Sequence, residues 1–293
     1  MKEVRASYEQ LHRDVEAMCL WLESLHIGID KNRVAEYRKT FAKIAEYQGH
    51  WDELGTSIGF RKLSDNYHDC SELILISQQL RSYDSPAFMN TLRQAVNGPT
   101  TLEAERAQTS DARNKIFELV MAAQFRGAGF PPKFVEPADA LVNVYNVRCF
   151  LECKRIQNEA RLEERVREAS SQIEDRLHKQ LSRKPKGLIA VDISKAQNDG
   201  TLYLNAASSD DLSRQVDTIL DAVVDRNKRK LVSRLSPRVL GILFYLRTPA
   251  IIEDEGLLAN FRRLFILATP SSQKDKRICQ RMMNQFFHQG ATV

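Results

Sequence analysis

The chain has 293 residues, of which 43% are hydrophobic and 28% charged, and its formal net charge is +5. It is too apolar for a disordered chain, and 12 glycines and 9 prolines exclude a collagen-like or low-complexity protein. The longest apolar run, residues 239–246, is far shorter than the roughly 20 residues that span a bilayer, and no apolar stretch follows Met1 as in a secretory signal. We therefore expect neither membrane insertion nor secretion.

The five cysteines have no Cys-x-x-Cys spacing, which argues against a zinc ribbon or a thioredoxin-type site. Free buried thiols are typical of proteins in a reducing compartment, so the cysteines predict a cytoplasmic location. They are Cys19, Cys70, Cys149, Cys153 and Cys279.

Residues 1–110 predict an all-helical module. Apolar residues at helical spacing predict helices over 11–25, 34–44 and 69–81, and a fourth from Pro86 to Gly98. Asp30 is expected to cap the second helix and Ser85 the fourth. Residues 99–110 are expected to be a connector. The module contains no recognisable motif, so we expect it to regulate, to dimerise or to bind a partner.

From residue 111 the pattern predicts a mixed α/β domain, 111–293. A helix over 112–126 is expected to stop at Gly127 and Gly129. Later runs are predicted as strands 133–136, 137–145 and 148–154, helix 158–182, strand 188–193, helix 210–230, strands 239–247 and 264–268, and a C-terminal helix. The connection at Asn146 and Val147 is short enough for a hairpin. This alternation of elements is typical of a layered α/β fold.

Two predicted strands carry charged residues that could take part in catalysis. Glu152 and Lys154 are two residues apart, so their side chains share one face, while Leu151 and Cys153 occupy the other. Asp139 begins the neighbouring strand and can approach Glu152 in a hairpin. Two such carboxylates favour a hard divalent cation such as Mg²⁺, and a lysine beside it can offset charge on a phosphate.

Pro137-x-Asp139 followed by Glu152-Cys153-Lys154, between two helices, resembles the PD-(D/E)XK nuclease superfamily, which includes restriction endonucleases. The resemblance covers residues 111–193. It implies a restriction-endonuclease-like mixed sheet flanked by helices, in the order helix-strand-strand-strand-helix-strand, here preceded by the all-helical N-terminal module.

The resemblance also implies roles for individual residues. Asp139 and Glu152 would bind Mg²⁺, for which Mn²⁺ is an accepted substitute, and the carbonyl group of Cys153 would add a third oxygen. Lys154 would be the catalytic lysine. Because one residue separates the proline and the aspartate of the motif, Glu136 remains an alternative ligand to Asp139.

Two further residues complete the implied site. Glu118, on the first helix of the core, matches a glutamate found in many family members. Gln172 matches a glutamine on the helix after the motif, with Gln157 as the alternative. The structural alternatives are that Glu118 is a partly exposed helix residue and that Glu152 and Lys154 form only a salt bridge.

Four arginines near the motif are candidates for binding nucleic acid, because cationic side chains neutralise phosphates without reading sequence. They are Arg155, Arg161, Arg165 and Arg176. The alternative is that they pair with the many glutamates of the same helix, one turn apart.

The sequence leads to the hypothesis of a Mg²⁺-dependent nuclease that hydrolyses DNA, with a role in restriction or phage defence by analogy with the family. Expected partners are DNA and, through the N-terminal helices, another protein or a second copy of the chain. The alternatives are a catalytically inactive protein of the same fold that binds nucleic acid or protein, and a structural subunit.

Overall fold

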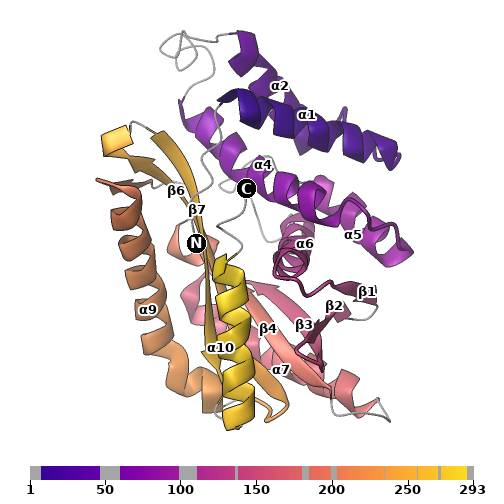
Figure 1. The fold of residues 1–293 in the computed structure, drawn as a ribbon, viewed down its shortest axis with the longest axis vertical. Coiled ribbons are helices and arrows are strands. Elements are labelled where there is room, and N and C mark those ends of the chain that lie inside the picture. The colour runs from indigo at the N-terminus through magenta and orange to yellow at the C-terminus, as the bar shows by residue number, and fades with distance from the viewer. Residues whose placement is uncertain are drawn as a thin grey trace.

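A computed structural model describes nine stretches of the chain: residues 8–46, 60–98, 111–135, 138–179, 185–198, 203–233, 235–255, 257–269 and 272–288. Within them the chain forms α-helices and one seven-stranded mixed sheet, so the predicted mixed α/β class is confirmed. The N-terminal helices lie together at one end of the molecule, and the sheet with its flanking helices forms the rest (Figure 1).

The N-terminal part is helical, as predicted. Its helices are α1 (Tyr8–Ser24), α2 (Arg33–Glu46), α4 (Phe60–Leu80) and α5 (Pro86–Val96). The side chain of Ser85 accepts a hydrogen bond from the backbone N–H of Phe88, which confirms the expected cap of α5. The cap expected at Asp30 is wrong. Asn32 lies directly before α2 and accepts from the N–H of Val34 at 2.9 Å, whereas Asp30 is too far from the first turn.

Helix α4 begins nine residues earlier than expected. Its first turns are polar, and the apolar spacing that marks a helix therefore starts only near residue 69. Several of these polar side chains are nevertheless buried, among them Ser64, Asn66 and His68. The side chain of Asn66 donates to Thr40 of α2 at 2.7 Å, so hydrogen bonding replaces apolar contact at this part of the helix.

Apart from a 3₁₀ turn at Glu159–Arg161 before the second helix, the next six elements follow the predicted order of helix, three strands, helix and strand. They are α6 (Asp111–Gly127), β1 (Lys133–Val135), β2 (Ala138–Val144), β3 (Val147–Arg155), α7 (Leu162–His178) and β4 (Lys186–Asp192). Helix α6 ends as expected, with Gly129 at a positive φ of 78° and the N–H of Phe130 donating to the carbonyl of Phe125. The remaining predicted end of α7, residues 180–182, lies outside the described residues.

Strand β3 lies inside the sheet, antiparallel to β2 and parallel to β4. The strand order is β1-β2-β3-β4-β6-β5, with β7 on the other side of β6. The later elements are α8 (Ser194–Gln197), β5 (Leu204–Ala206), α9 (Ser209–Ser233), β6 (Val239–Ile252), β7 (Leu257–Ala268) and α10 (Gln273–His288). The three-residue strand β5 was not predicted. The predicted strand 239–247 ends before the observed end of β6 at Ile252, because a proline such as Pro249 is rare in a central strand.

The β2–β3 hairpin turns at Tyr145 and Asn146, one residue before the expected connection. Both residues have a positive φ, 46° and 68°, as a two-residue turn between twisted strands requires. Val147 already pairs with Val144. Outside the turn, the guanidinium group of Arg281 from α10 lies 4.0 Å from the centre of the Tyr145 ring, and the Tyr145 hydroxyl donates to the Arg281 carbonyl at 3.1 Å.

The two faces of the sheet are covered by different helices. Leu151 points to the side on which Phe117 of α6 and Phe286 of α10 pack, and this core continues without a break into the N-terminal helices. Phe150 points to the other side, toward Ile173 of α7 and Leu220 of α9. The expected boundary between module and domain, in residues 99–110, lies outside the described residues.

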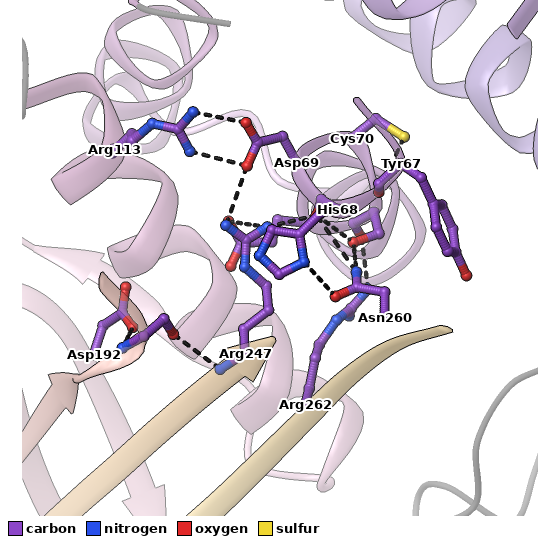
Figure 2. Close-up of polar contacts among 12 residues, drawn as sticks. Tyr67, His68, Asp69, Cys70, Arg113, Asp192, Arg247, Asn260 and Arg262 are labelled. Carbon is purple, nitrogen blue, oxygen red and sulfur yellow. Dashed lines mark hydrogen bonds and ion pairs between the residues drawn. The ribbon is translucent and has the colours of Figure 1, made fainter. Parts of the chain in front are cut away.

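A buried ion cluster, consisting of Asp69, Glu72, Arg113 and Arg247, joins the N-terminal helices to the sheet. Figure 2 shows Asp69, Arg113 and Arg247. Asp69 of α4 contacts Arg113 of α6 at 2.7 Å and Arg247 of β6 at 3.2 Å, and all three side chains are only 3% exposed. Arg247 also lies 3.4 Å from Glu72. Burial alone would raise the pKa of Asp69, but Arg113 and then Arg247 hold it well below its usual range.

All five cysteines are free thiols, as expected, and only Cys153 is more than slightly exposed. Each described helix is too short or too polar to cross a lipid bilayer.

Asp69→Asn removes the negative charge between two buried guanidinium groups. We expect it to lower the free energy of unfolding by about 3–5 kcal/mol, because Arg113 and Arg247 lose the carboxylate that they share, although Arg247 keeps Glu72. Chemical denaturation measures the change. Asp225→Asn is the control, since Asp225 is 68% exposed and pairs with Lys228 one turn away; little change is expected there. Equal effects of the two substitutions would show that the buried ion cluster contributes no more to the free energy of unfolding than an exposed ion pair does.

Gly187→Ala tests how closely α7 packs on the sheet. A methyl group on Gly187 would lie 2.5 Å from Cγ2 and 2.8 Å from Cδ1 of Ile173, which is fully buried on α7. We expect a loss of about 1–3 kcal/mol of stability, because a branched side chain in a packed core cannot turn away. Gly28→Ala is the control, since nothing lies within 4 Å of its added carbon. Its melting temperature should stay near that of the wild type.

Candidate active site

The hairpin places two carboxylates at the same point of the sheet. Ala140 pairs with Leu151, and continuing this antiparallel register by one residue brings Asp139 opposite Glu152. Residues on this face of the two strands, Leu141 and Phe150, pack toward α7. The Asp139 carboxylate turns to the end of β3 and accepts the backbone N–H of Cys153 at 2.7 Å.

Glu152 is held by an arginine from the following helix. Its Oε1 atom lies 2.5 Å from Nη1 of Arg176, and the two side chains are 3% and 13% exposed. A carboxylate buried to this degree requires a compensating charge. Arg176 supplies it from the last turn of α7.

Lys154 is held by two residues one turn apart on α7. Its Nζ atom donates to Oε1 of Gln172 at 2.8 Å and lies 3.4 Å from Oε1 of Glu168. Glu168 also contacts Arg165 at 2.8 Å on the helix surface. The lysine is therefore held within the site, while its partner Glu168 also pairs with Arg165 at the solvent-exposed surface of α7.

Glu118 reaches the same place from α6. It forms an ion pair with Lys115, with Nζ–O distances of 2.8 and 2.9 Å. The pKa of Glu118 is raised to about 7, chiefly by burial and then by the Asp139 carboxylate, while Lys115 opposes both. Asp139 and Glu152 both contribute to this shift, so Glu118 lies within electrostatic range of the two hairpin carboxylates.

Glu118, Asp139 and Glu152 together form what we call the carboxylate cluster. Burial raises the pKa of Glu152 to about 7, with Asp139 adding to the effect and Arg176 and Lys154 opposing it. Burial also raises the pKa of Asp139, against the hydrogen bond from Cys153. Burial is the largest cause of all three shifts, and the Asp139 carboxylate adds to it for Glu118 and Glu152, so the cluster is favourable for a cation.

In the described part of the chain, no group of three His, Cys, Asp or Glu side chains is placed to hold a metal ion. Arg176 and the Cys153 amide instead engage the oxygens of Glu152 and Asp139. By chemistry the donors suit a hard divalent cation, because they are carboxylates in mutual repulsion. The Cys153 carbonyl lies on the same side of β3 as its N–H, and therefore toward Asp139.

The structure thus brings together Glu118, Asp139, Glu152, Lys154 and Gln172, the five residues for which catalytic roles were expected. Of the two glutamines left open, Gln172 contacts Lys154 and Gln157 is exposed. Glu136, the alternative ligand, lies outside the described residues.

The four arginines are placed differently from one another. Arg155 is buried and paired with Asp192 at 2.8 Å, so it faces the interior of the protein. Arg161, directly before α7, and Arg165, on α7, remain exposed, and each contacts a glutamate three residues on, the pairing considered as the alternative. Arg176 lies within the site.

Sequence reasoning missed two polar partners in the site. Lys115 lies three residues before Glu118, so helical spacing alone pointed to that contact. Glu168 lies four residues before Gln172, so spacing placed the two on one face of α7 but did not show the contact of Glu168 with Lys154. The pairing of Arg176 with Glu152 had no such signal, because it joins a helix to a strand.

No protein-family model matches this chain, and no curated protein is significantly similar to it. The geometry of the site and the order of the elements are therefore the grounds on which a function is inferred.

The raised pKa values of Glu118 and Glu152 predict how stability depends on pH. The folded chain binds these protons more tightly than the unfolded chain, so the contribution of both groups to stability falls as pH rises from about 4.5 to about 7. Glu118→Gln removes one of these charges. We expect it to raise the stability by on the order of 1 kcal/mol at pH 8 and to change it little at pH 5.

Thermal or chemical unfolding at both pH values measures this difference. Glu164→Gln, a substitution of a glutamate that is 46% exposed on α7, is the control and should behave alike at both. An equal effect of Glu118→Gln at pH 5 and pH 8 would contradict the burial of a charged carboxylate at this position.

Proposed function

We propose that the chain is a metal-dependent nuclease of the PD-(D/E)XK type, with a restriction-endonuclease-like core, that hydrolyses DNA phosphodiester bonds with Mg²⁺ or Mn²⁺. One observation carries the proposal: Glu118, Asp139, Glu152, Lys154 and Gln172 converge from α6, β2, β3 and α7. Residues from four separate elements meet at the end of a hairpin, and they supply both the acids and the lysine that the chemistry needs.

Asp139, Glu152 and the carbonyl group of Cys153 would hold the divalent cation. When bound, this ion supplies a positive charge beside the phosphate and favours deprotonation of water. Lys154 Nζ, directed by Gln172, donates a hydrogen bond to the attacking water or to a phosphate oxygen. Glu118, with a pKa near 7, can accept a proton at its carboxylate at neutral pH.

A second candidate is an inactive protein of the same fold that binds nucleic acid or a protein. It is favoured by the ion pair of Glu152 with Arg176, which compensates the buried carboxylate without a metal. The role in restriction or defence, and the binding of a protein partner or a second copy through the N-terminal helices, stay predictions.

A cleavage assay with plasmid and linear DNA in Mg²⁺ or Mn²⁺ tests the proposal. Wild-type protein is expected to cut, and Lys154→Ala and Asp139→Ala are each expected to slow cleavage by at least about 100-fold. Lys62→Ala, on the exposed side of α4 and paired with Glu36, should cut like the wild type.

Equal inactivity of all the proteins across both metals and both substrates would sink the enzyme proposal. Metal-independent binding of DNA by the wild type, without cleavage, would support the second candidate. Comparing the melting temperatures of the variants separates loss of chemistry from loss of the fold.

A further inference from the structure

The pairing of Arg176 with Glu152 has a consequence for how the site would bind a metal and a phosphate. Both side chains are nearly buried and 2.5 Å apart, and Glu152 is also a proposed metal ligand. A guanidinium group and a divalent cation at one carboxylate repel each other strongly in a poorly solvated place. They would therefore compete for Glu152.

The charges around the site sharpen this point. The carboxylate cluster and Glu168 provide four negative charges, and Lys115, Lys154 and Arg176 provide three positive charges. The site as a whole thus carries a formal excess of one negative charge. Adding a divalent cation reverses the sign of this excess, and adding a phosphodiester group restores neutrality.

Arg176 is suited to bind that phosphate. Its guanidinium group is planar and permanently charged, and such groups bind phosphate oxygens through two parallel hydrogen bonds. It lies on the same helix as Gln172, one turn further on, and Gln172 holds Lys154. A short movement of the guanidinium group away from Glu152 would therefore leave it close to Lys154, where the phosphate would bind.

We propose that Arg176 is a phosphate-binding residue that pairs with Glu152 only while no metal is bound. A metal ion at Glu152 releases the guanidinium group, which then binds the scissile phosphate. This inference rests on the proposed nuclease function. It makes metal and DNA bind cooperatively, because each removes the unfavourable charge that the other would face.

Mn²⁺ binding to the full chain, followed by the electron paramagnetic resonance signal of the free ion, tests this. Without DNA at about pH 8.5, where the carboxylates are ionised, Arg176→Gln is expected to bind Mn²⁺ about tenfold more tightly than the wild type. Arg214→Gln on α9 removes an equal charge from a side chain that is 74% exposed, and its Mn²⁺ affinity should not change. Unchanged or weaker Mn²⁺ binding by Arg176→Gln would show that Arg176 only supports Glu152, and would overturn the inference.

The cooperativity is measured in a Lys154→Ala background, so that a short DNA duplex is not cut. DNA is expected to tighten Mn²⁺ binding about tenfold in this protein, and to have no such effect once Arg176→Gln is added. Arg176→Lys guards against misfolding: it keeps the charge, so Mn²⁺ affinity stays near the wild-type value, but it loses the paired hydrogen bonds and thus most of the cooperativity. Full cooperativity in either Arg176 variant would overturn the inference.

The failures of the two proposals are distinguishable. A wild-type protein that binds no Mn²⁺ and cuts no DNA argues against the nuclease function itself. A wild-type protein that binds Mn²⁺ and cuts DNA, together with an Arg176→Gln variant of unchanged Mn²⁺ affinity, argues against the role of Arg176 alone.

Discussion

The carboxylate of Asp69 is the contact on which the arrangement of the molecule depends. It lies away from water between Arg113 and Arg247, and a buried charge of this kind is tolerated only while its counter-ions stay in place. The three side chains come from α4, α6 and β6. Their contacts join α6 to α4 and to the sheet, and α6 carries Glu118.

Arg247 also connects the buried ion cluster to the site. The backbone N–H of Arg247 donates to the Ser194 hydroxyl, the Ser194 N–H donates to Asp192, and Asp192 is paired with Arg155 (Figure 2 shows the contacts as far as Asp192). Arg155 directly follows Lys154. An unbroken series of buried polar contacts thus runs from the N-terminal helices to the strand that bears the lysine. The helices in residues 8–98 therefore belong to the support of the site, and their removal would expose charges as well as apolar surface.

Much of the fold could be predicted because most elements follow simple periodicity. The stripe on α7 from Leu162 to Leu177 and the apolar run of β4 have no competing interpretation. The errors have physical causes: polar residues are buried in the first turns of α4, Pro249 interrupts the strand pattern of β6, and β5 is too short for any pattern. Within the site, Lys154 and Gln172 could be paired through spacing and family resemblance. The contact between Arg176 and Glu152 depends on how α7 lies over β3, which no local pattern encodes.

The contact between Tyr145 and Arg281 ties the closed end of the β2–β3 hairpin to α10. Asp139 and Glu152 stand at the open end of the same hairpin. Because α10 holds the closed end of the hairpin, the position of the two carboxylates at the open end depends partly on how α10 packs.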